Sequence, residues 1–489
     1  MTATNVRVRF PPSPTGGPHV GNIRTAIFNW LFARHHGGDF IIRVEDTDQA
    51  RKVEGSTEEL MEALRWLGVE WDEGPDIGGD FGPYIQSQRL DLYREHVETL
   101  LERGAAYRCF CSPQRLAEVR ERQGREKQPM GYDRRCRDLE QAADGDAVPV
   151  VRFRMPLEGE TSVDDLVRGH VSFENGLVDD FVMLKSDGFP TYHLANVVDD
   201  HHMEISHVMR AEEWLSSIPR HLQLYEAFGW EPPRFAHLPI VLAPDRSKLS
   251  KRHGATSVLE YREMGYLPDA LLNFLTLLGW SLDDKTEIFS PDDLKRHFTI
   301  ERVGKSGAIF SSEKLEWMNG SYIRAASPEL LAEALMDFWR QYPPSEIPVL
   351  PDMSYLLRIV PLVHERLKTL REAAPLIAFL FKDEVDYDAA DIVQKGMDAE
   401  STGAALEAAH SGLSGLSTFH GDSIEGLLRP LAQELNVKAG QLFGSLRVAT
   451  TGQKVAPPLF ETIEVLGRER TLTSVRRAID LLQTSAEPA

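Results

Sequence analysis

The chain has 489 residues, of which 42% are hydrophobic and 26% are charged, and its formal net charge is -21. This length exceeds what one hydrophobic core holds, and it predicts roughly three to five domains. No apolar run is long enough to span a bilayer and the first ten residues lack the apolar core of a signal peptide, so we expect no membrane insertion. Three cysteines are too few to crosslink such a chain, which indicates the reducing cytoplasm.

The acidic net charge argues against loose, non-specific binding of nucleic acid, because the field of the whole protein repels phosphate. A nucleic-acid partner would need a local basic patch. The stretch from Arg108 to Arg137 offers one, since nine basic residues there outnumber four acidic ones. A solvated helix surface explains the same stretch equally well.

A strand, a turn, a helix and a second strand are predicted in the first 44 residues. Val6, Val8 and Phe10 alternate with polar residues, as in a strand, and a turn rich in proline and glycine follows. The helix ends at Gly37-Gly38, before the apolar run 40–44. Its expected apolar face consists of Ile23, Ala26, Ile27, Trp30 and Leu31. Such a βαβ unit implies a parallel sheet.

Two polar segments have the composition of phosphate-binding loops. The first places His19, Gly21 and Asn22 at the start of the predicted helix, where free N–H groups and the helix dipole favour an anion. The second, APDRSKLSKRHGA, follows the apolar stretch 235–242. Taken singly, a turn with an incidental histidine and a solvated basic loop remain the alternatives.

Together these segments resemble the two signatures of class I aminoacyl-tRNA synthetases, and RFPPSPTGGPHVGN is similar to the glutamyl branch of bacteria. The resemblance implies a Rossmann-type domain that binds ATP, with Mg²⁺ bridging the phosphate oxygens. Asn22 stands where the signature has a second histidine, so His19 supplies the only imidazole. The resemblance implies catalytic roles for His19, Lys248 and Lys251, and further ATP contacts from Gly21, Asn22 and Ser250.

Charged residues end three of the predicted strands, namely Arg9, Glu45 and Arg210. Ligands of doubly wound sheets bind outside the carboxyl ends of the strands. Two guanidiniums and one carboxylate suit a ligand with two carboxylates and one ammonium, such as glutamate. Without the family resemblance, buried structural ion pairs are the alternative.

The resemblance continues through GFPTYHLANVVDDHHMEISHVMRAEEW. It implies six glutamate contacts, which are Arg9, Ser13, Glu45, Tyr192, Asn196 and Arg210. Pro11 stands where alanine is expected and lacks a backbone N–H. For the run 199–202, Asp-Asp-His-His, a polar helix terminus is a sufficient explanation, and we predict no metal site there.

All three cysteines lie in one segment, as Cys109-Phe110-Cys111 and Cys136. In a reducing compartment this favours a tetrahedral zinc site over a disulfide, and three reduced core cysteines are the alternative. By resemblance to CxC…CxH patterns of the family, Asp138 is the expected fourth ligand. The resemblance also implies that residues 106–200 form an insertion that handles the acceptor end of tRNA, where the basic stretch would meet phosphates.

Helical patterns replace strand signals after residue 325. Ser327-Pro328 predicts a helix start, and further amphipathic stretches cover 356–370, 424–435 and 475–482. The stretch 397–419 is too rich in alanine, glycine and serine to assign. An all-helical region of this kind has a purely structural alternative, but the resemblance implies that it binds the anticodon, with Arg366 and Arg447 as contacts.

The expected fold class is α/β, a Rossmann-type catalytic domain with an insertion, followed by an all-α region. The resemblance implies ligation of glutamate to tRNA(Glu) by a cytoplasmic monomer. The alternatives are an enzyme that also charges tRNA(Gln), a non-catalytic tRNA-binding paralogue, and a small-molecule nucleotidylyltransferase, which would not need the helical appendage. The expected domains are 1–105 and 201–240 for the catalytic halves, 106–200 for the insertion, 241–325 for the second signature and contacts with the tRNA stem, and 326–489 for the anticodon region.

Overall fold

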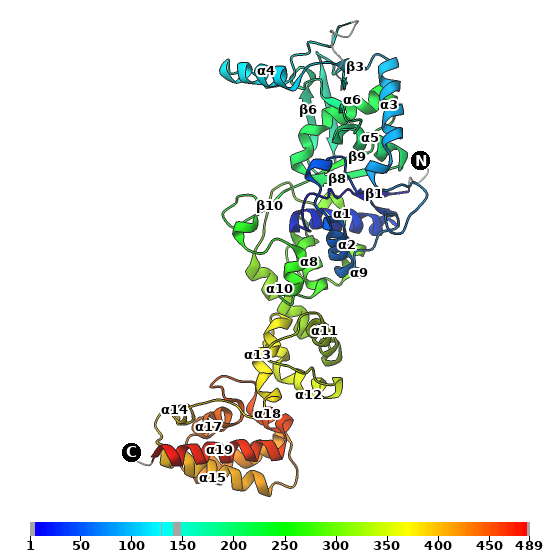
Figure 1. The fold of residues 1–489 in the computed structure, drawn as a ribbon. Helices are drawn as coiled ribbons and strands as arrows, with labels where there is room; N and C mark the ends of the chain where they lie inside the picture. Colours follow the sequence, from blue (N-terminus) through cyan, green and yellow to red (C-terminus); the bar gives the residue numbers. More distant parts are fainter. Residues whose placement is uncertain (1–4, 129, 140–147, 487–489) are drawn as a thin grey trace. The chain divides into compact units, whose positions relative to one another are not determined.

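The computed structural model describes residues 5–128, 130–139 and 148–486, and it leaves out the side chains of Lys251 and of residues 485–486. The chain divides into two compact units (Figure 1). The first comprises residues 1–262 and 268–315, and the second comprises residues 263–267 and 316–489. Each unit is described by itself below.

The predicted βαβ unit opens the first unit. Strand β1 (Arg7–Phe10), helix α1 (Val20–His36) and strand β2 (Asp39–Ile42) follow in order, and β1 pairs with β2 in parallel. Gly37 ends α1 in the left-handed conformation, with φ 65°. A second parallel pair joins β8 (His207–Ala211) to β9 (Arg234–Leu238), and the Ser206 N–H donates to the Arg7 carbonyl beside it. The prediction of parallel α/β structure is therefore confirmed.

Helix α1 is more deeply buried than its expected apolar stripe. Every residue from 23 to 33 is buried, including Arg24 and Asn29. The reason is that α1 packs against β1 and β8 and also against α8 (Pro268–Leu277) and α9 (Pro291–His297). The five residues of the expected apolar face are therefore buried as predicted, and the neighbouring elements bury the opposite face as well.

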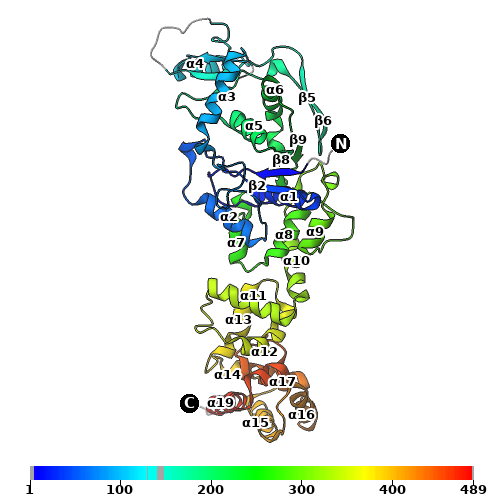
Figure 2. The same ribbon diagram turned by 90° about the vertical axis from the view of Figure 1, so that its right-hand side faces the viewer.

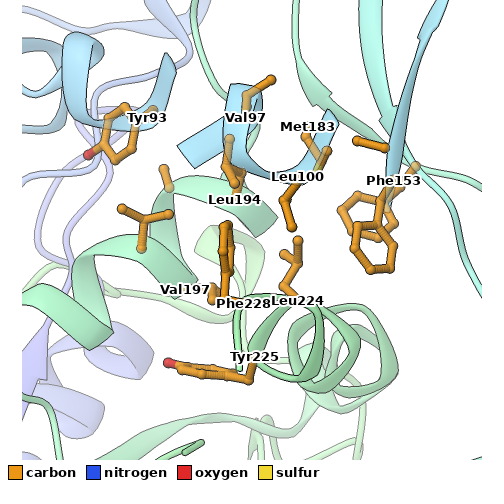
Figure 3. Close-up of a cluster of buried hydrophobic side chains, with 14 of the residues drawn as sticks. Tyr93, Val97, Leu100, Phe153, Met183, Leu194, Val197, Leu224, Tyr225 and Phe228 are labelled. Atoms are coloured by element: carbon orange, nitrogen blue, oxygen red, sulfur yellow. The ribbon is translucent and has the colours of Figure 1, made fainter. Parts of the chain in front are cut away.

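Between β2 and β8 the chain adds an antiparallel layer. Strands β3 (Ala106–Cys109), β4 (Val150–Phe153) and β7 (Val182–Leu184) form one sheet, and β5 (Glu160–Asp165) and β6 (Gly169–Glu174) form a hairpin. Figure 3 shows side chains of α3 (Leu90–Glu102), α5 (Tyr192–His202) and α6 (Ile218–Phe228) packed together with Phe153 and Met183. Helix α4 (Pro113–Arg125) carries much of the basic stretch.

The first unit also contains α2 (Ser56–Trp66), and β10 (Val241–Leu242) pairs in parallel with β11 (Ala308–Ile309). Helices α7 (Val258–Glu263) and α10 (Ser312–Ala325) lead towards the second unit along the chain.

The second unit contains helices and no strands among its described residues (Figure 2). As predicted, Ser327 begins a helix, because its hydroxyl accepts the Leu330 N–H at 3.3 Å. The α-helices are α11 (Pro328–Gln341), α12 (Met353–Val363), α13 (Ala373–Ile377), α14 (Ala389–Ile392), α15 (Ala399–Gly415), α16 (Gly421–Glu434), α17 (Ala439–Thr451), α18 (Leu459–Leu466) and α19 (Arg468–Ala486).

The stretch that composition left unassigned forms helix α15. Asp398 begins it with a capping box to Ser401. Its buried face is made of small and aliphatic residues, among them Ala405, Leu406 and Ala409, and it packs along α19. Small side chains let the two helices approach closely, which explains a composition that looks featureless in the sequence. No described helix combines the length and the apolar composition needed to cross a membrane.

Candidate active site

A cavity of 310 Å³ lies at the carboxyl ends of β1 and β8. Its wall gathers five of the six residues predicted to bind glutamate, although they come from segments up to about 200 residues apart in the sequence. These five are Arg9, Ser13, Glu45, Tyr192 and Arg210. The wall also contains residues that the sequence did not indicate, which are Thr15, Thr47, Asp48, Arg51 and Trp214.

Asn196, the sixth predicted residue, lies behind the wall. It is 1% exposed, and its amide donates to Glu45 Oε1 at 3.2 Å. The same oxygen accepts from Arg43 Nη2 at 2.9 Å. Burial raises the pKa of Glu45, although Arg43 and Arg9 act in the opposite direction. Asn196 is thus in contact with the predicted pocket through Glu45.

A buried ion-pair network around Asp199 and Asp200 lies behind the wall of this cavity. Arg9 donates to both carboxylate oxygens of Asp200 at 2.9 and 3.1 Å, and Arg43 donates to the same aspartate at 2.7 Å. Asp199 accepts from Arg89 at 2.7 Å and from the Tyr93 hydroxyl at 2.8 Å. The run 199–202 does end helix α5, as expected, but its two aspartates are not solvated, since they are 0% and 2% exposed. They neutralise arginines that the fold has removed from water.

Arg210 differs from Arg9 in its partners. Its nitrogens donate to His237 at 3.1 Å, to the Tyr192 hydroxyl at 3.0 Å and to the Trp214 carbonyl at 3.3 Å. The ion pairs found among the described residues do not include Arg210, which is only 5% exposed. A buried guanidinium with neutral acceptors is suited to an anionic ligand, because the ligand supplies the missing charge.

A second cavity, of 510 Å³, adjoins the first. His19, Gly21, Asn22 and Lys248 line it, as predicted for one nucleotide site, and Ser13, Arg210 and Trp214 line both cavities. His19 is the N-cap of α1, and its Nδ1 accepts the Gly21 N–H at 3.1 Å. The positive end of α1 thus faces a space large enough for a nucleotide.

The KLSKR loop meets this second cavity through Lys248 and Leu249. The Lys248 ammonium pairs with Glu213 at 2.7 Å, and both side chains are at least half exposed. Ser250 does not line the cavity, because its hydroxyl lies 3.1 Å from His253 Nδ1 and is engaged there. The side chain of Lys251 lies outside the described part of the structure.

The three cysteines come together at the end of β3, with their sulfurs within 4.8 Å of one another. Cys111 and Cys136 sulfurs are 3.5 Å apart. The hydroxyl of Tyr132 lies among them, at 3.3 Å from Cys109 and 3.7 Å from Cys111. Thiols gathered without a disulfide are the donor set of a structural zinc site.

Asp138 does not join this cluster, contrary to the expectation from the sequence. Its side chain is 84% exposed and pairs with Arg154 at 3.0 Å. Within the turn at residues 135–138, Cys136 is 4% exposed whereas Asp138 reaches solvent. The Tyr132 hydroxyl contacts two of the thiols instead, and the spacing of cysteines and histidines did not indicate it.

Much of the basic stretch is neutralised within the protein. Arg115 pairs with Asp133, and Arg137 pairs with Asp180 at 2.8 Å. The described ion pairs do not include Arg120 and Arg122, which lie on α4 (Figure 1). In the second unit, Arg366 is exposed and donates to the Ala456 carbonyl at 2.9 Å, whereas Arg447 lies within α17 and is partly buried.

A parallel α/β core with a nucleotide-sized cavity at a helix N-terminus and a basic loop in the cavity wall is the arrangement of a nucleotide-binding enzyme, and the family match identifies it as a class I aminoacyl-tRNA synthetase. Residues 5–317 match the family of class I tRNA synthetases (E and Q), catalytic domain, and residues 330–479 match the anticodon binding domain family.

Similar proteins narrow the class to one branch. The chain is 56% identical to a glutamate–tRNA ligase of Dehalococcoides mccartyi, over 97% of this chain and 98% of the relative. It is 50% identical to that of Roseiflexus castenholzii, over 98% and 96%. The crystal structure of a glutamate tRNA ligase from Elizabethkingia meningosepticum in complex with its amino acid superposes with a TM-score of 0.88 at 35% identity, covering 98% of this chain and all of that one. The chain belongs to the glutamyl-tRNA synthetase family.

Proposed function

We propose that the protein attaches glutamate to tRNA(Glu) in two steps at the paired cavities. In the first step the α-carboxylate of glutamate attacks the α-phosphorus of ATP. The bond between this phosphorus and the bridging oxygen to the β-phosphate breaks, and pyrophosphate leaves. In the second step the terminal ribose hydroxyl of tRNA attacks the acyl carbon, and AMP leaves. The observation that carries the proposal is that the two cavities share Ser13, Arg210 and Trp214, since the reacting carboxylate and phosphate must meet.

The glutamate cavity would hold the substrate by its charges. Arg210 has no acidic partner among the described residues, and Nη1 of Arg9 is buried without a hydrogen-bond partner. Both guanidiniums are therefore available for carboxylates. Glu45 offers its carboxylate to the substrate ammonium, and Tyr192 and Asn196 hold Arg210 and Glu45 in place.

The nucleotide cavity would hold ATP with the phosphates at the start of α1. His19, Gly21 and Asn22 present the helix N-terminus, and Lys248 supplies a positive charge to the pyrophosphate end. Class I synthetases use ATP with Mg²⁺, which would neutralise part of the phosphate charge when bound. For Lys251 and Ser250 the proposed phosphate roles rest on their place in the KLSKR loop. Ser250 does not line the cavity, and the side chain of Lys251 is outside the described structure.

A zinc ion fits the cysteine cluster of Cys109, Cys111 and Cys136. Bound there, the metal would crosslink β3 to the turn at Cys136 and contribute to folding without taking part in the reaction. We propose Tyr132 in place of Asp138 as the fourth donor. Zinc analysis of Asp138→Ala and Tyr132→Phe tests this, because only the second variant should lose affinity. Loss of zinc in Asp138→Ala alone would restore the original assignment.

The partner of the basic stretch would be the acceptor end of tRNA(Glu), and that of the second unit its anticodon. Two observations support this. Arg120 and Arg122 on α4 form none of the described ion pairs, and the exposed Arg366 donates one hydrogen bond to a main-chain carbonyl. Cytoplasmic location rests on the low cysteine content, and the monomeric state stays an expectation.

Two assays test the function. Glutamate-dependent exchange of pyrophosphate into ATP, with and without tRNA, reports activation, and the absence of exchange in every condition would leave a tRNA-binding paralogue as the better reading. Charging of purified tRNA(Glu) and tRNA(Gln) reports specificity. Comparable rates on both would contradict the preference for tRNA(Glu).

A further inference from the structure

Arg210 is held by a buried chain of hydrogen bonds that starts outside both cavities. Asp165 ends strand β5, His237 lies on β9 and Arg210 lies on β8. The Asp165 carboxylate and His237 Nδ1 are 2.6 Å apart, and both side chains are 0% exposed. On the other side of the ring, the Arg210 Nε–H donates to His237 Nε2 at 3.1 Å. The chain thus joins the β5–β6 hairpin to the cavity wall.

The partners of Asp165 fix which nitrogen of His237 carries the proton. Main-chain N–H groups of Val167, Arg168 and His237 donate to the carboxylate at 3.0, 2.8 and 3.1 Å. A carboxylate anchored in this way only accepts, so His237 Nδ1 must carry the proton. Burial lowers the pKa of His237, outweighing the hydrogen bond to Asp165. Nε2 is therefore unprotonated, and its lone pair accepts the hydrogen bond from the Arg210 Nε–H.

Within the described residues, the hydrogen-bond partners of Arg210 are all neutral. They are the imidazoles of His237 and His221, the Tyr192 hydroxyl and the Trp214 carbonyl. Burial lowers the pKa of His221 well below its ordinary value, so it stays uncharged. Arg9, by contrast, is neutralised by Asp200. Neutral acceptors orient the guanidinium without compensating its charge, whereas a carboxylate in their place would compete with an acidic substrate.

We infer that Asp165 and His237 are positioning residues that fix Arg210 for glutamate binding. The inference rests on the proposed role of Arg210 in the glutamate cavity. Neither residue lines the glutamate cavity or the nucleotide cavity, so neither is placed to touch substrate there. By holding the Nε edge, His237 directs the two terminal nitrogens of Arg210 towards Tyr192 and Trp214, which line the cavity.

Asp165→Asn tests the inference with little change in volume. The amide oxygen would stay with the main-chain donors, and the amide NH₂ would then face His237 Nδ1. This forces the proton to Nε2, where it opposes the Arg210 Nε–H. Because hydrogen bonds to charged groups are strong, we expect the glutamate KM to rise roughly ten-fold to hundred-fold. We expect the KM for ATP to stay within about two-fold, because the proposed phosphate contacts, His19 and Lys248, line only the nucleotide cavity and are not held by this chain of hydrogen bonds.

Two His237 variants repeat the test without altering the β5 anchor. Gln places an oxygen where Nε2 lies and keeps an acceptor for Arg210, whereas Asn ends short of it. We therefore expect a smaller rise of the glutamate KM in His237→Gln than in His237→Asn, a difference that a merely structural role would not produce. Asp164→Asn is the matched control, because Asp164 also pairs with a histidine, His170, at 2.8 Å, but on the exposed face of the same strand.

The measurements are pyrophosphate exchange at varied glutamate and varied ATP, together with thermal unfolding of each variant. An unchanged glutamate KM in folded Asp165→Asn would overturn the inference. Equal effects of the two His237 variants, or a parallel rise in the KM for ATP, would also overturn it. Failure of the wild-type protein to activate glutamate would refute the proposed function instead, and the two failures are thus distinguishable.

Discussion

The replacement Asp200→Asn probes the ion-pair network beneath the glutamate cavity. Asp200 is 2% exposed and accepts hydrogen bonds from Arg9 and Arg43, which are both fully buried. Asn has nearly the same shape, but it loses the negative charge and turns one acceptor into a donor that faces guanidinium N–H groups. Arg43 keeps Glu45 as a partner at 2.9 Å, whereas Arg9 loses the only ion pair described for it.

The expected cost follows from the burial of the arginines. Removing one partner of a buried ion pair destabilises a protein by about 3–5 kcal/mol. Because Asn retains one oxygen and Arg43 retains Glu45, we expect the lower end, about 3 kcal/mol of the free energy of unfolding at neutral pH. Burial by itself raises the pKa of Asp200, but Arg9 and Arg43 outweigh it, and the net pKa lies below the ordinary value of 3.8. Its stabilisation is therefore complete above pH 3.8 and is lost as the pH falls through the lower folded-state value.

Urea unfolding of wild type and Asp200→Asn, at about pH 7 and about pH 5, measures this difference. We expect the same difference at both pH values, and a rise in the glutamate KM as Arg9 loses its position. Asp91→Asn is the control, since Asp91 forms an exposed pair with Arg94 and is 98% exposed, so no measurable change is expected. A difference below about 1 kcal/mol, or one that shrinks between the two pH values, would refute the reasoning.

Three further predictions concern the other sites. Lys248→Ala should slow pyrophosphate exchange about 100-fold with little change in the glutamate KM, because Lys248 lines only the nucleotide cavity, and a rise confined to the glutamate KM would contradict this. Cys136→Ala should reduce zinc from about one ion per chain to near zero by metal analysis, and undiminished zinc would exclude the cluster as its site. The double variant Arg120→Ala, Arg122→Ala should weaken tRNA binding and lower the salt-dependence slope by about 2, and an unchanged slope would mean that α4 does not meet phosphate.

The sequence alone predicted those features that depend on a few consecutive residues. The alternation at Val6–Phe10, the turn and the stop at Gly37 predicted the βαβ unit, and Ser327 predicted the start of α11. Such features depend on local backbone preferences, which each segment carries with it. The charges at the ends of predicted strands indicated Arg9, Glu45 and Arg210 as one group, and all three line the same cavity.

Other features arise only from the packing of distant segments. The burial of α1 on all sides depends on α8 and α9, which follow more than 200 residues later in the chain. Asp199 and Asp200 do lie at a polar helix end, yet tertiary structure surrounds them with arginines from β1, from the segment after β2 and from the start of α3. Asp138 follows the expected spacing, but the backbone directs it to solvent and brings in Tyr132.

The sequence by itself determined the class of the fold, the two phosphate-binding segments and the charge of the residues that a dicarboxylate requires. Only the tertiary structure decided which of those charges are already neutralised. Arg9 is held by Asp200, whereas Arg210 is held by neutral imidazoles, one of them fixed by Asp165 on another strand. The physical reason is that the electrostatic state of a buried group is set by whatever surrounds it in space, and sequence spacing does not contain that information.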